Sequence, residues 1–178
     1  MSALTKKEIR CRMKELETAF LATDGPETEA EAIWSRVEAS EAFINADTVL
    51  LYMAIPGEVP TQKFIDRWYG RKRLVIPKVQ GDELGLYEYS PEHLTAGYRG
   101  IMEPGPDAVP VSPDSIDLAL VPGVAFTRKG DRLGRGKGFY DRLLSQMKCP
   151  CAGIGYSFRW IKELPTDEWD ARLSMISF

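Results

Sequence analysis

Apolar runs along the chain predict the strands of one sheet. Three near-continuous runs are typical of strands covered on both faces, as in a parallel sheet: residues 48–54, 117–121 and 151–156. Residues 73–79 predict another strand, broken at Pro77. Residues 84–89 alternate more loosely, which predicts a more exposed and antiparallel strand. The pattern therefore favours a mainly parallel sheet with one antiparallel member.

Helical periodicity predicts helices before and between these strands. Thr5 and Glu8 have the spacing of a capping box. Apolar residues then recur at helical spacing to about residue 22: Ile9, Met13, Leu16 and Phe20. A second helix is predicted over about residues 29–43, and a third after Thr61, a natural N-cap residue.

Alternating strands and amphipathic helices predict an α/β fold, a three-layer α/β/α sandwich around a mainly parallel sheet. A length of 178 residues suits a single domain over residues 1–178. Residues 91–115 contain five prolines and are interpreted as a wrapping loop. A last short strand is predicted at residues 173–176.

The stretch from residue 121 to residue 141 is rich in glycine and cations: Gly130, Gly134, Gly136 and Gly138 with Arg128, Lys129, Arg132, Arg135 and Lys137. Glycines let backbone N–H groups approach phosphate oxygens, and a following helix N-terminus adds partial positive charge. The spacing fits neither a P-loop, because Gly138 follows Lys137, nor a G-x-G-x-x-G fingerprint. A solvated surface loop is the alternative. The exit through Phe139 and Tyr140 into an amphipathic helix favours phosphate binding.

Glu58 follows the predicted strand at residues 48–54, where open α/β sheets place their ligands. A carboxylate there can accept paired hydrogen bonds from a ring amide and an amino group, as on a pterin. An exposed loop acid is the alternative.

Composition narrows the class of protein. The net charge of −3 argues against a broad nucleic-acid surface, and no apolar run approaches a membrane span. The charged N-terminus predicts no signal peptide. Three cysteines, Cys11, Cys149 and Cys151, fit a reducing cytosol, so a cytoplasmic location is expected. The single histidine, His93, is a weak metal or catalytic candidate.

The segments V-P-G-V-A-F and R-L-G-R-G-K-G-F-Y-D, within residues 121–141, closely resemble the signature of the 5-formyltetrahydrofolate cyclo-ligase family. The resemblance spans about residues 5–176 and is strongest over residues 121–141. It implies a Rossmann-like fold of the sugar-isomerase and CoA-transferase type. It also implies that ATP and 5-formyltetrahydrofolate give 5,10-methenyltetrahydrofolate, ADP and phosphate, with Mg²⁺.

The resemblance also implies roles for individual residues. ATP contacts fall on a K-x-x-Φ-R segment (Φ apolar) and on the loop: Lys6, Arg10, Arg132, Gly134, Arg135, Gly136, Lys137, Gly138, Phe139 and Tyr140. Arg132, Arg135 and Lys137 are the candidate catalytic cations, since phosphoryl transfer needs positioning and charge stabilisation. Folate contacts fall on Met53, Glu58, Phe139 and Tyr140, and Mg²⁺ ligands on Asp141 and Asp170.

Each assignment has a plainer alternative. Lys6 and Arg10 can be two solvated charges, Asp141 a helix first-turn acid, and Met53 an ordinary core residue. Two positions depart from the family pattern: Phe139 replaces the more frequent tyrosine, and Trp169 replaces a histidine.

Three other functions compete with the cyclo-ligase. The basic loop could hold RNA phosphates, the fold could store 5-formylfolate without catalysis, or it could be a sugar-phosphate isomerase. Net acidity opposes the first, and no convincing general base supports the last. The expected partners are therefore the small molecules ATP and 5-formyltetrahydrofolate, with no membrane or nucleic acid. The chain is expected to be a monomer.

Overall fold

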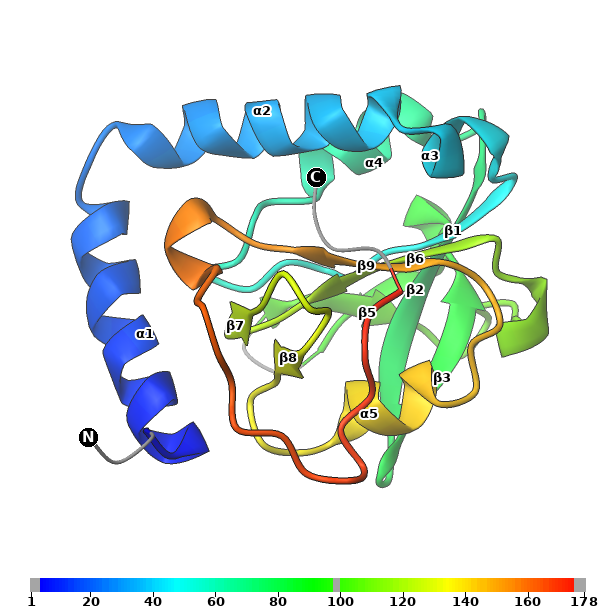
Figure 1. Cartoon of the computed structure of the whole chain (residues 1–178). Coiled ribbons are helices and arrows are strands. Elements are labelled where there is room, and N and C mark those ends of the chain that lie inside the picture. The colour runs from blue at the N-terminus through cyan, green and yellow to red at the C-terminus, as the bar shows by residue number, and fades with distance from the viewer. Residues whose placement is uncertain (1–3, 98–99, 175–178) are drawn as a thin grey trace.

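A computed structural model describes residues 4–97 and 100–174. Five strands form one sheet in the order β3-β2-β1-β6-β9 (Figure 1). Their bounds are β1 Thr48–Leu50, β2 Arg73–Gln80, β3 Glu83–Glu88, β6 Leu118–Pro122 and β9 Cys151–Ile154. β2, β1, β6 and β9 run parallel, and β3 pairs antiparallel with β2. The α/β class and the antiparallel member are thus as predicted.

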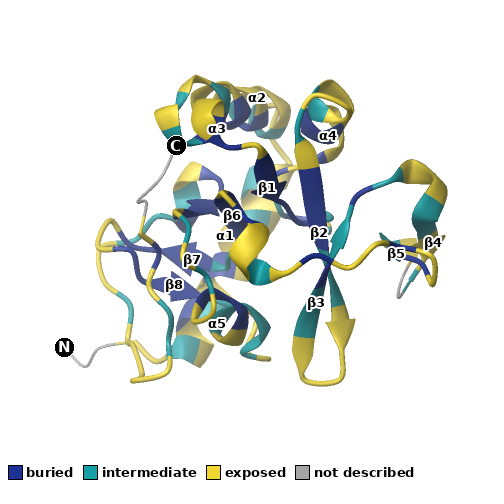
Figure 2. Ribbon diagram, turned by 90° about the vertical axis from the view of Figure 1, so that its right-hand side faces the viewer, coloured by how far each residue is buried: buried dark blue, intermediate teal, exposed yellow. Residues whose placement is uncertain are grey.

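Helices cover both faces of the sheet. α2 (Gly25–Ala39), α3 (Glu41–Asn45) and α4 (Gln62–Trp68) lie on one face, and the short α5 (Phe139–Leu144) lies on the other (Figures 1 and 2). Alternate strand residues serve the two faces, which makes three layers. Val49 and Leu120 belong to the cluster under α2, whereas Leu50 and Val121 belong to the cluster with α5. This double burial explains why the strands read as continuous apolar runs.

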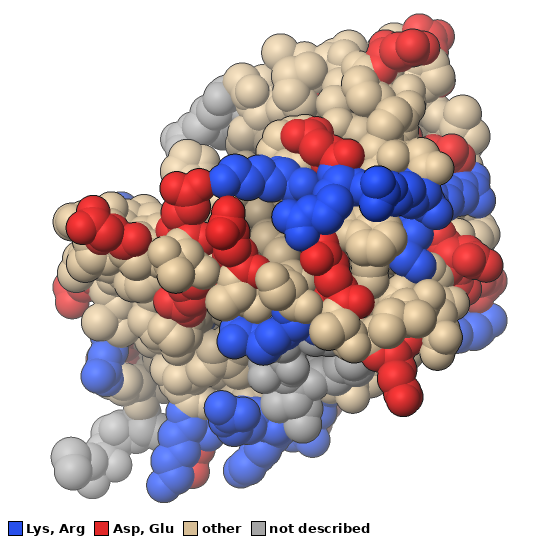
Figure 3. Space-filling model, turned by 90° about the horizontal axis from the view of Figure 1, so that it is seen from above, with Lys and Arg blue, Asp and Glu red and all other residues tan. Residues whose placement is uncertain are grey.

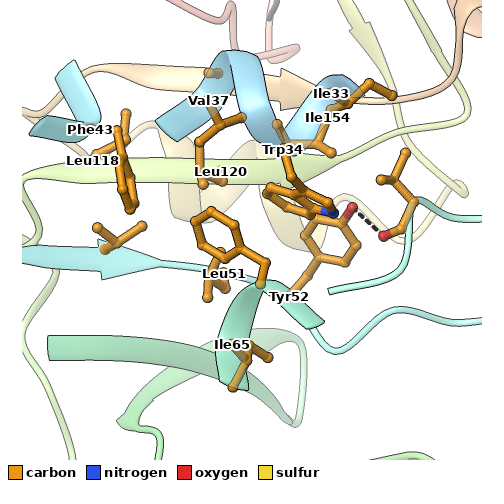
Figure 4. Packing of buried hydrophobic residues seen from close by; sticks show 14 of the residues in the cluster. Ile33, Trp34, Val37, Phe43, Leu51, Tyr52, Ile65, Leu118, Leu120 and Ile154 are labelled. Atoms are coloured by element: carbon orange, nitrogen blue, oxygen red, sulfur yellow. Dashed lines mark hydrogen bonds between the residues drawn. The ribbon is translucent and has the colours of Figure 1, made fainter. Parts of the chain in front are cut away.

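The core beneath α2 and α4 is rich in aromatic side chains. Trp34 of α2 packs against Phe64 of α4 with ring centroids 4.4 Å apart. Trp34, Val37 and Leu51 lie in the same cluster (Figure 4). Tyr52 is buried in the same cluster, and its hydroxyl donates to the carbonyl of Val59 at 2.8 Å. This hydrogen bond pins the loop after β1 to the core.

The outer face of the α2–α4 layer mixes both signs of charge (Figure 3). Lys63 of α4 pairs with Glu27 of α2 at 2.5 Å, and Arg67 pairs with Glu38 at 2.8 Å. That face therefore holds ion pairs rather than a single-signed patch.

The first helix, α1 (Lys6–Leu21), begins at the predicted capping box. The Glu8 N–H donates to the Thr5 hydroxyl, and the Glu8 carboxylate accepts from the Thr5 N–H at 2.8 Å. Its buried residues Ile9 and Met13 pack on a hairpin formed by β7 (Ala125–Phe126) and β8 (Arg132–Leu133). α1 therefore covers the β7–β8 hairpin that follows the carboxyl end of β6 (Figure 1).

Four details differ from the sequence predictions. The second predicted helix is two helices, α2 and α3, divided at Ser40. β2 continues through Pro77, which pairs with Leu86 of β3; β2 pairs with β1 only over its first three residues, so the missing N–H breaks no ladder there. Thr61 precedes α4 but makes no capping hydrogen bond, and its hydroxyl instead accepts from the Ala54 N–H at 3.4 Å.

The fourth difference concerns residues 91–115, which are not one loop. They contain a hairpin of β4 (Leu94–Ala96) and β5 (Met102–Pro104), with 3₁₀ turns at Pro91–His93 and Pro113–Ser115. A further 3₁₀ turn, Ser157–Arg159, follows β9. The predicted strand at 173–176 lies partly outside the described residues, and its described part, Leu173 and Ser174, is not in a strand. Among the described residues, no helix combines the length and apolarity of a membrane span.

Candidate active site

The glycine-rich loop, residues 134–138, joins β8 to α5. Gly136 and Gly138 have φ angles of 102° and 68°, in the left-handed region where a side chain is strained. A Cβ on Gly138 would also lie 2.8 Å from the Arg142 guanidinium. The loop folds over a cavity of about 210 Å³ whose walls include Glu58, Arg132, Lys137, Phe139, Tyr140 and Asp141. The structure therefore brings the predicted phosphate loop and the predicted folate acid to one cavity.

Arg132 lies beneath the loop with its guanidinium buried. It donates to the Pro122 carbonyl at 3.1 Å and to Asp141 Oδ1 at 3.1 Å. Its Nε is buried without a hydrogen-bond partner in the described structure. Its guanidinium carbon lies 5.3 Å from the centroid of the Tyr140 ring. Arg132 thus ties the end of β6 to the start of α5.

Glu58 projects from the loop after β1, with 11% of its side chain exposed. Its Oε2 accepts from the Ile55 N–H at 3.2 Å, and its Oε1 lies 3.3 Å from Nη2 of Arg135. Burial raises the pKa of the Glu58 carboxyl, against the opposing effects of the Ile55 N–H and the Arg135 guanidinium. A partly buried acid with one weak cationic partner is suited to accept ligand donors.

Arg159 fixes the Glu58 loop from below, and the sequence analysis missed it. Its side chain is 3% exposed; it donates to the carbonyls of Gly57 at 2.8 Å and Val124 at 3.0 Å and pairs with Glu17. A lone cation within the apolar residues 151–161 was the available signal. Tyr52 holds the far side of the same loop through Val59.

Tyr140 and Phe139 begin α5 and line the cavity with Glu58. Burial and the charge of Glu58 raise the pKa of the Tyr140 hydroxyl, which therefore stays protonated as a hydrogen-bond donor. Phe139 lies under the Arg142 guanidinium, 5.6 Å from centroid to carbon. Met53 is half-buried against the core cluster under α2 and does not line the cavity.

The first turns of α1 also reach the loop. Arg10 Nε donates to the Gly134 carbonyl at 2.9 Å. Lys6 contacts Asp167 at 2.7 Å and Asp170 at 2.5 Å. Burial works to lower the pKa of Lys6, but the hydrogen bonds that its ammonium donates to Asp167 and Asp170 raise the pKa overall. The predicted N-terminal cations therefore lie against the loop and the predicted metal acids, rather than free in solvent.

Asp141 and Asp170 border a second groove, of about 580 Å³, on the outer side of α5. The described residues hold no group of three or more potential ligand side chains. Mg²⁺ commonly takes one or two carboxylates and completes its shell with phosphate oxygens and water, so two carboxylates on one groove match the number that it needs. Each carboxylate has a cationic neighbour, Arg132 for Asp141 and Lys6 for Asp170.

Lys137 is exposed at the tip of the loop, and in the described structure its ammonium makes no hydrogen bond or ion pair. His93 lies in the 3₁₀ turn before β4, Cys151 begins β9 and Cys149 precedes it; none borders either cavity. The structure thus groups the predicted loop residues with Lys6, Arg10, Glu58, Asp141 and Asp170, and sets Met53 apart.

Known proteins are similar to this chain in sequence and in fold. The model of the 5-formyltetrahydrofolate cyclo-ligase family matches residues 3–178. Proteins named 5-formyltetrahydrofolate cyclo-ligase from Escherichia coli K12 and Mycolicibacterium smegmatis are 33% and 35% identical over 151 and 160 residues. These matches cover 80% and 84% of this chain, and 83% and 81% of the relatives.

Solved structures agree with the sequence matches. The NMR structure of Aquifex aeolicus 5,10-methenyltetrahydrofolate synthetase superposes with a TM-score of 0.85 at 37% identity, covering 96% of this chain and 87% of that one. The Mycoplasma pneumoniae 5,10-methenyltetrahydrofolate synthetase gives 0.76 at 27% identity, covering 98% and 99%. The chain therefore belongs to the 5-formyltetrahydrofolate cyclo-ligase family.

Proposed function

We propose that this chain uses ATP to convert 5-formyltetrahydrofolate to 5,10-methenyltetrahydrofolate, with release of ADP and phosphate. The observation that carries the proposal is the placement of Glu58 and the glycine-rich loop on one cavity. This placement supports the proposal, because a carboxylate suited to accept from a pterin lies beside a cationic loop suited to phosphates. Family membership supports the same reaction.

The reaction proceeds in two displacements. The formyl oxygen attacks the γ-phosphorus of ATP, the bond from phosphorus to the ADP oxygen breaks, and an imidate phosphate forms. N10 of the folate then attacks the formyl carbon, loses its proton, and the carbon–oxygen bond breaks to release phosphate. Neither step requires a covalent protein nucleophile, so positioning and charge stabilisation suffice.

The loop residues divide between contact and support. Lys137 and Arg135 are exposed and are assigned to the transferring phosphoryl group, with the backbone N–H groups of Gly134, Gly136 and Gly138. Arg132 is assigned a positioning role, because its guanidinium faces inward to Pro122 and Asp141. Lys6 and Arg10 act from α1 on the nucleotide side.

Asp141 and Asp170 would hold Mg²⁺ on the outer side of α5. A bound Mg²⁺ supplies charge neutralisation to the phosphate oxygens. Asp170 is oriented by Lys6 and by the Asp167 N–H, which donates to it at 2.7 Å. Asp141 is oriented by Arg132.

On the folate side, Glu58 accepts from the ring amide and amino group of the pterin. Tyr140 and Phe139 supply a hydroxyl donor and an aromatic wall. Met53 is a more distant apolar contact. We further propose that the chain works as a single-domain monomer in the cytoplasm, without membrane or nucleic acid. The non-catalytic folate- or RNA-binding alternative has no specific observation in its favour.

The direct test is to incubate the full chain with ATP, MgCl₂ and 5-formyltetrahydrofolate. The expected result is a rise in methenyltetrahydrofolate absorbance matched by one ADP per product. Binding of folate and nucleotide without product would support the storage alternative and reject the enzyme.

A further inference from the structure

The second groove contains an indole that the fold does not use. Trp169 is 74% exposed, although it is the largest side chain that borders the groove. Its segment is held by backbone and carboxylate contacts instead. The Asp170 N–H donates to the Asp167 carbonyl at 3.1 Å, and Asp170 is anchored by Lys6. An indole has a wide apolar face and a polar N–H, so an exposed indole beside polar groups is free to take a ligand partner.

The second groove offers the room that the small cavity under the loop lacks. The cavity at Glu58 has about 210 Å³, less than the 300 Å³ or so at the lower end of ligand pockets. It has no room for a nucleoside as well as a pterin. The second groove has about 580 Å³ and shares Gly138 and Asp141 with the first. A nucleotide whose phosphates lie at Asp141 therefore has room for its nucleoside end along α5.

The charged residues around Trp169 favour a nucleotide that extends along α5. Asp141 and Asp170, the proposed Mg²⁺ ligands, lie on the same groove as the indole, and so do Arg142 and Arg172. Arg142 already donates to the Asp82 carbonyl, and Arg172 pairs with Asp131 at 3.0 Å. Trp169 is thus the groove residue with a wide apolar face still free of partners in the described structure. An aromatic face beside a phosphate and metal site is suited to a heteroaromatic base.

We infer that Trp169 stacks on the purine base of the nucleotide, and so positions ATP and discriminates it from base-free polyphosphates. The inference rests on the proposed function for the place of the phosphates. It assigns a role to the position where this chain departs from the histidine of the family pattern. Stacking uses the face of the base, so an aromatic replacement should preserve most of it, whereas truncation to alanine should not.

The test measures binding of Mg-ADP to the full chain by titration calorimetry, with Mg-tripolyphosphate as a base-free probe. Trp169→Ala should weaken ADP binding about tenfold or more, the scale of one stacked base, and leave tripolyphosphate binding unchanged. Trp169→Phe should retain most of the ADP affinity. Tyr69→Ala, which removes another exposed aromatic from the end of α4, is the matched control and should bind both ligands normally.

Wild-type ADP affinity in Trp169→Ala would overturn the inference. So would equal weakening of ADP and tripolyphosphate, or failure of the wild-type chain to bind Mg-ADP. Quenching of tryptophan emission by ADP in the wild type, lost in Trp169→Phe, is a second expected result. Product formation by the wild type is measured separately. If ADP binding depends on Trp169 but no product forms, only the proposed reaction is rejected. If product forms but Trp169→Ala binds ADP as the wild type does, only the stacking is rejected.

Discussion

Nη2 of Arg135, in the glycine-rich loop, lies 3.3 Å from Oε1 of Glu58, in the loop after β1. The two residues belong to the proposed phosphate and folate sites, so without ligands each site neutralises the other. A pterin that donates to Glu58 would release Arg135 toward the phosphates. The contact therefore links the two binding events physically.

Folate and nucleotide should consequently bind with positive coupling. Arg135 is 53% exposed, and exposed pairs contribute about 0.2–1 kcal/mol, so the coupling should reach about fivefold. The measurement is the Kd of Mg-ADP with and without 5-formyltetrahydrofolate, a combination that cannot react. Glu58→Gln should remove most of the coupling, and coupling undiminished in that variant would contradict the linkage.

Glu58 should also lower stability at neutral pH. Its pKa is higher in the folded chain than in the unfolded chain, so between the two values the folded state binds more protons. Stability therefore falls as pH rises from the unfolded pKa, near 4.5, through the raised folded value. Glu58→Gln should flatten this fall and unfold at equal or higher urea concentration at pH 7, while its folate KM rises. A urea midpoint that drops at pH 7 would oppose this account.

The sequence predicted most of the sheet because its strands are buried on both faces. It did not predict that β1 ends at Leu50, since Leu51 and Tyr52 beyond the strand end are as deeply buried as the strand itself. The capping box located α1 because that signal is local. The supporting role of Arg159 was not predicted because its acceptors, Val124 and Gly57, are 35 and 102 residues away in the sequence. Local sequence patterns thus predicted the helices, the strands and the glycine-rich loop. The contacts of Arg159 that support the Glu58 loop are tertiary, so no local pattern predicts them.

Lys137→Ala should lose about 3 kcal/mol of transition-state stabilisation, roughly a hundredfold in kcat/KM, as expected for a removed charge clamp. Stability should be unchanged, because the exposed ammonium makes no hydrogen bond or ion pair among the described residues. Lys129→Ala, an exposed lysine between β7 and β8, is the matched control. Turnover of Lys137→Ala close to wild type would remove this residue from the mechanism.

Asp141→Asn should raise the Mg²⁺ concentration that gives half-maximal activity, because an amide oxygen is a weaker ligand for a hard cation. The substitution also takes the ion partner from Arg132, so a urea titration must accompany the assay. Asp114→Asn, an exposed acid paired with Lys148, serves as the control. If folded Asp141→Asn has an unchanged Mg²⁺ requirement, the Asp141 carboxylate serves only as the ion partner of Arg132 and is not a metal ligand.

Arg159→Met should destabilise the fold by about 3 kcal/mol, because it leaves Glu17 and the carbonyls of Gly57 and Val124 without their donor. Arg67→Met is the matched control, since Arg67 is 45% exposed and its pair with Glu38 should contribute less than about 1 kcal/mol. Both are measured by urea unfolding. Arg159→Met should in addition raise the folate KM more than the ATP KM, because Arg159 holds the loop that carries Glu58. Equal effects of the two substitutions on stability, or an ATP KM that rises as much as the folate KM, would show that Arg159 does not position Glu58.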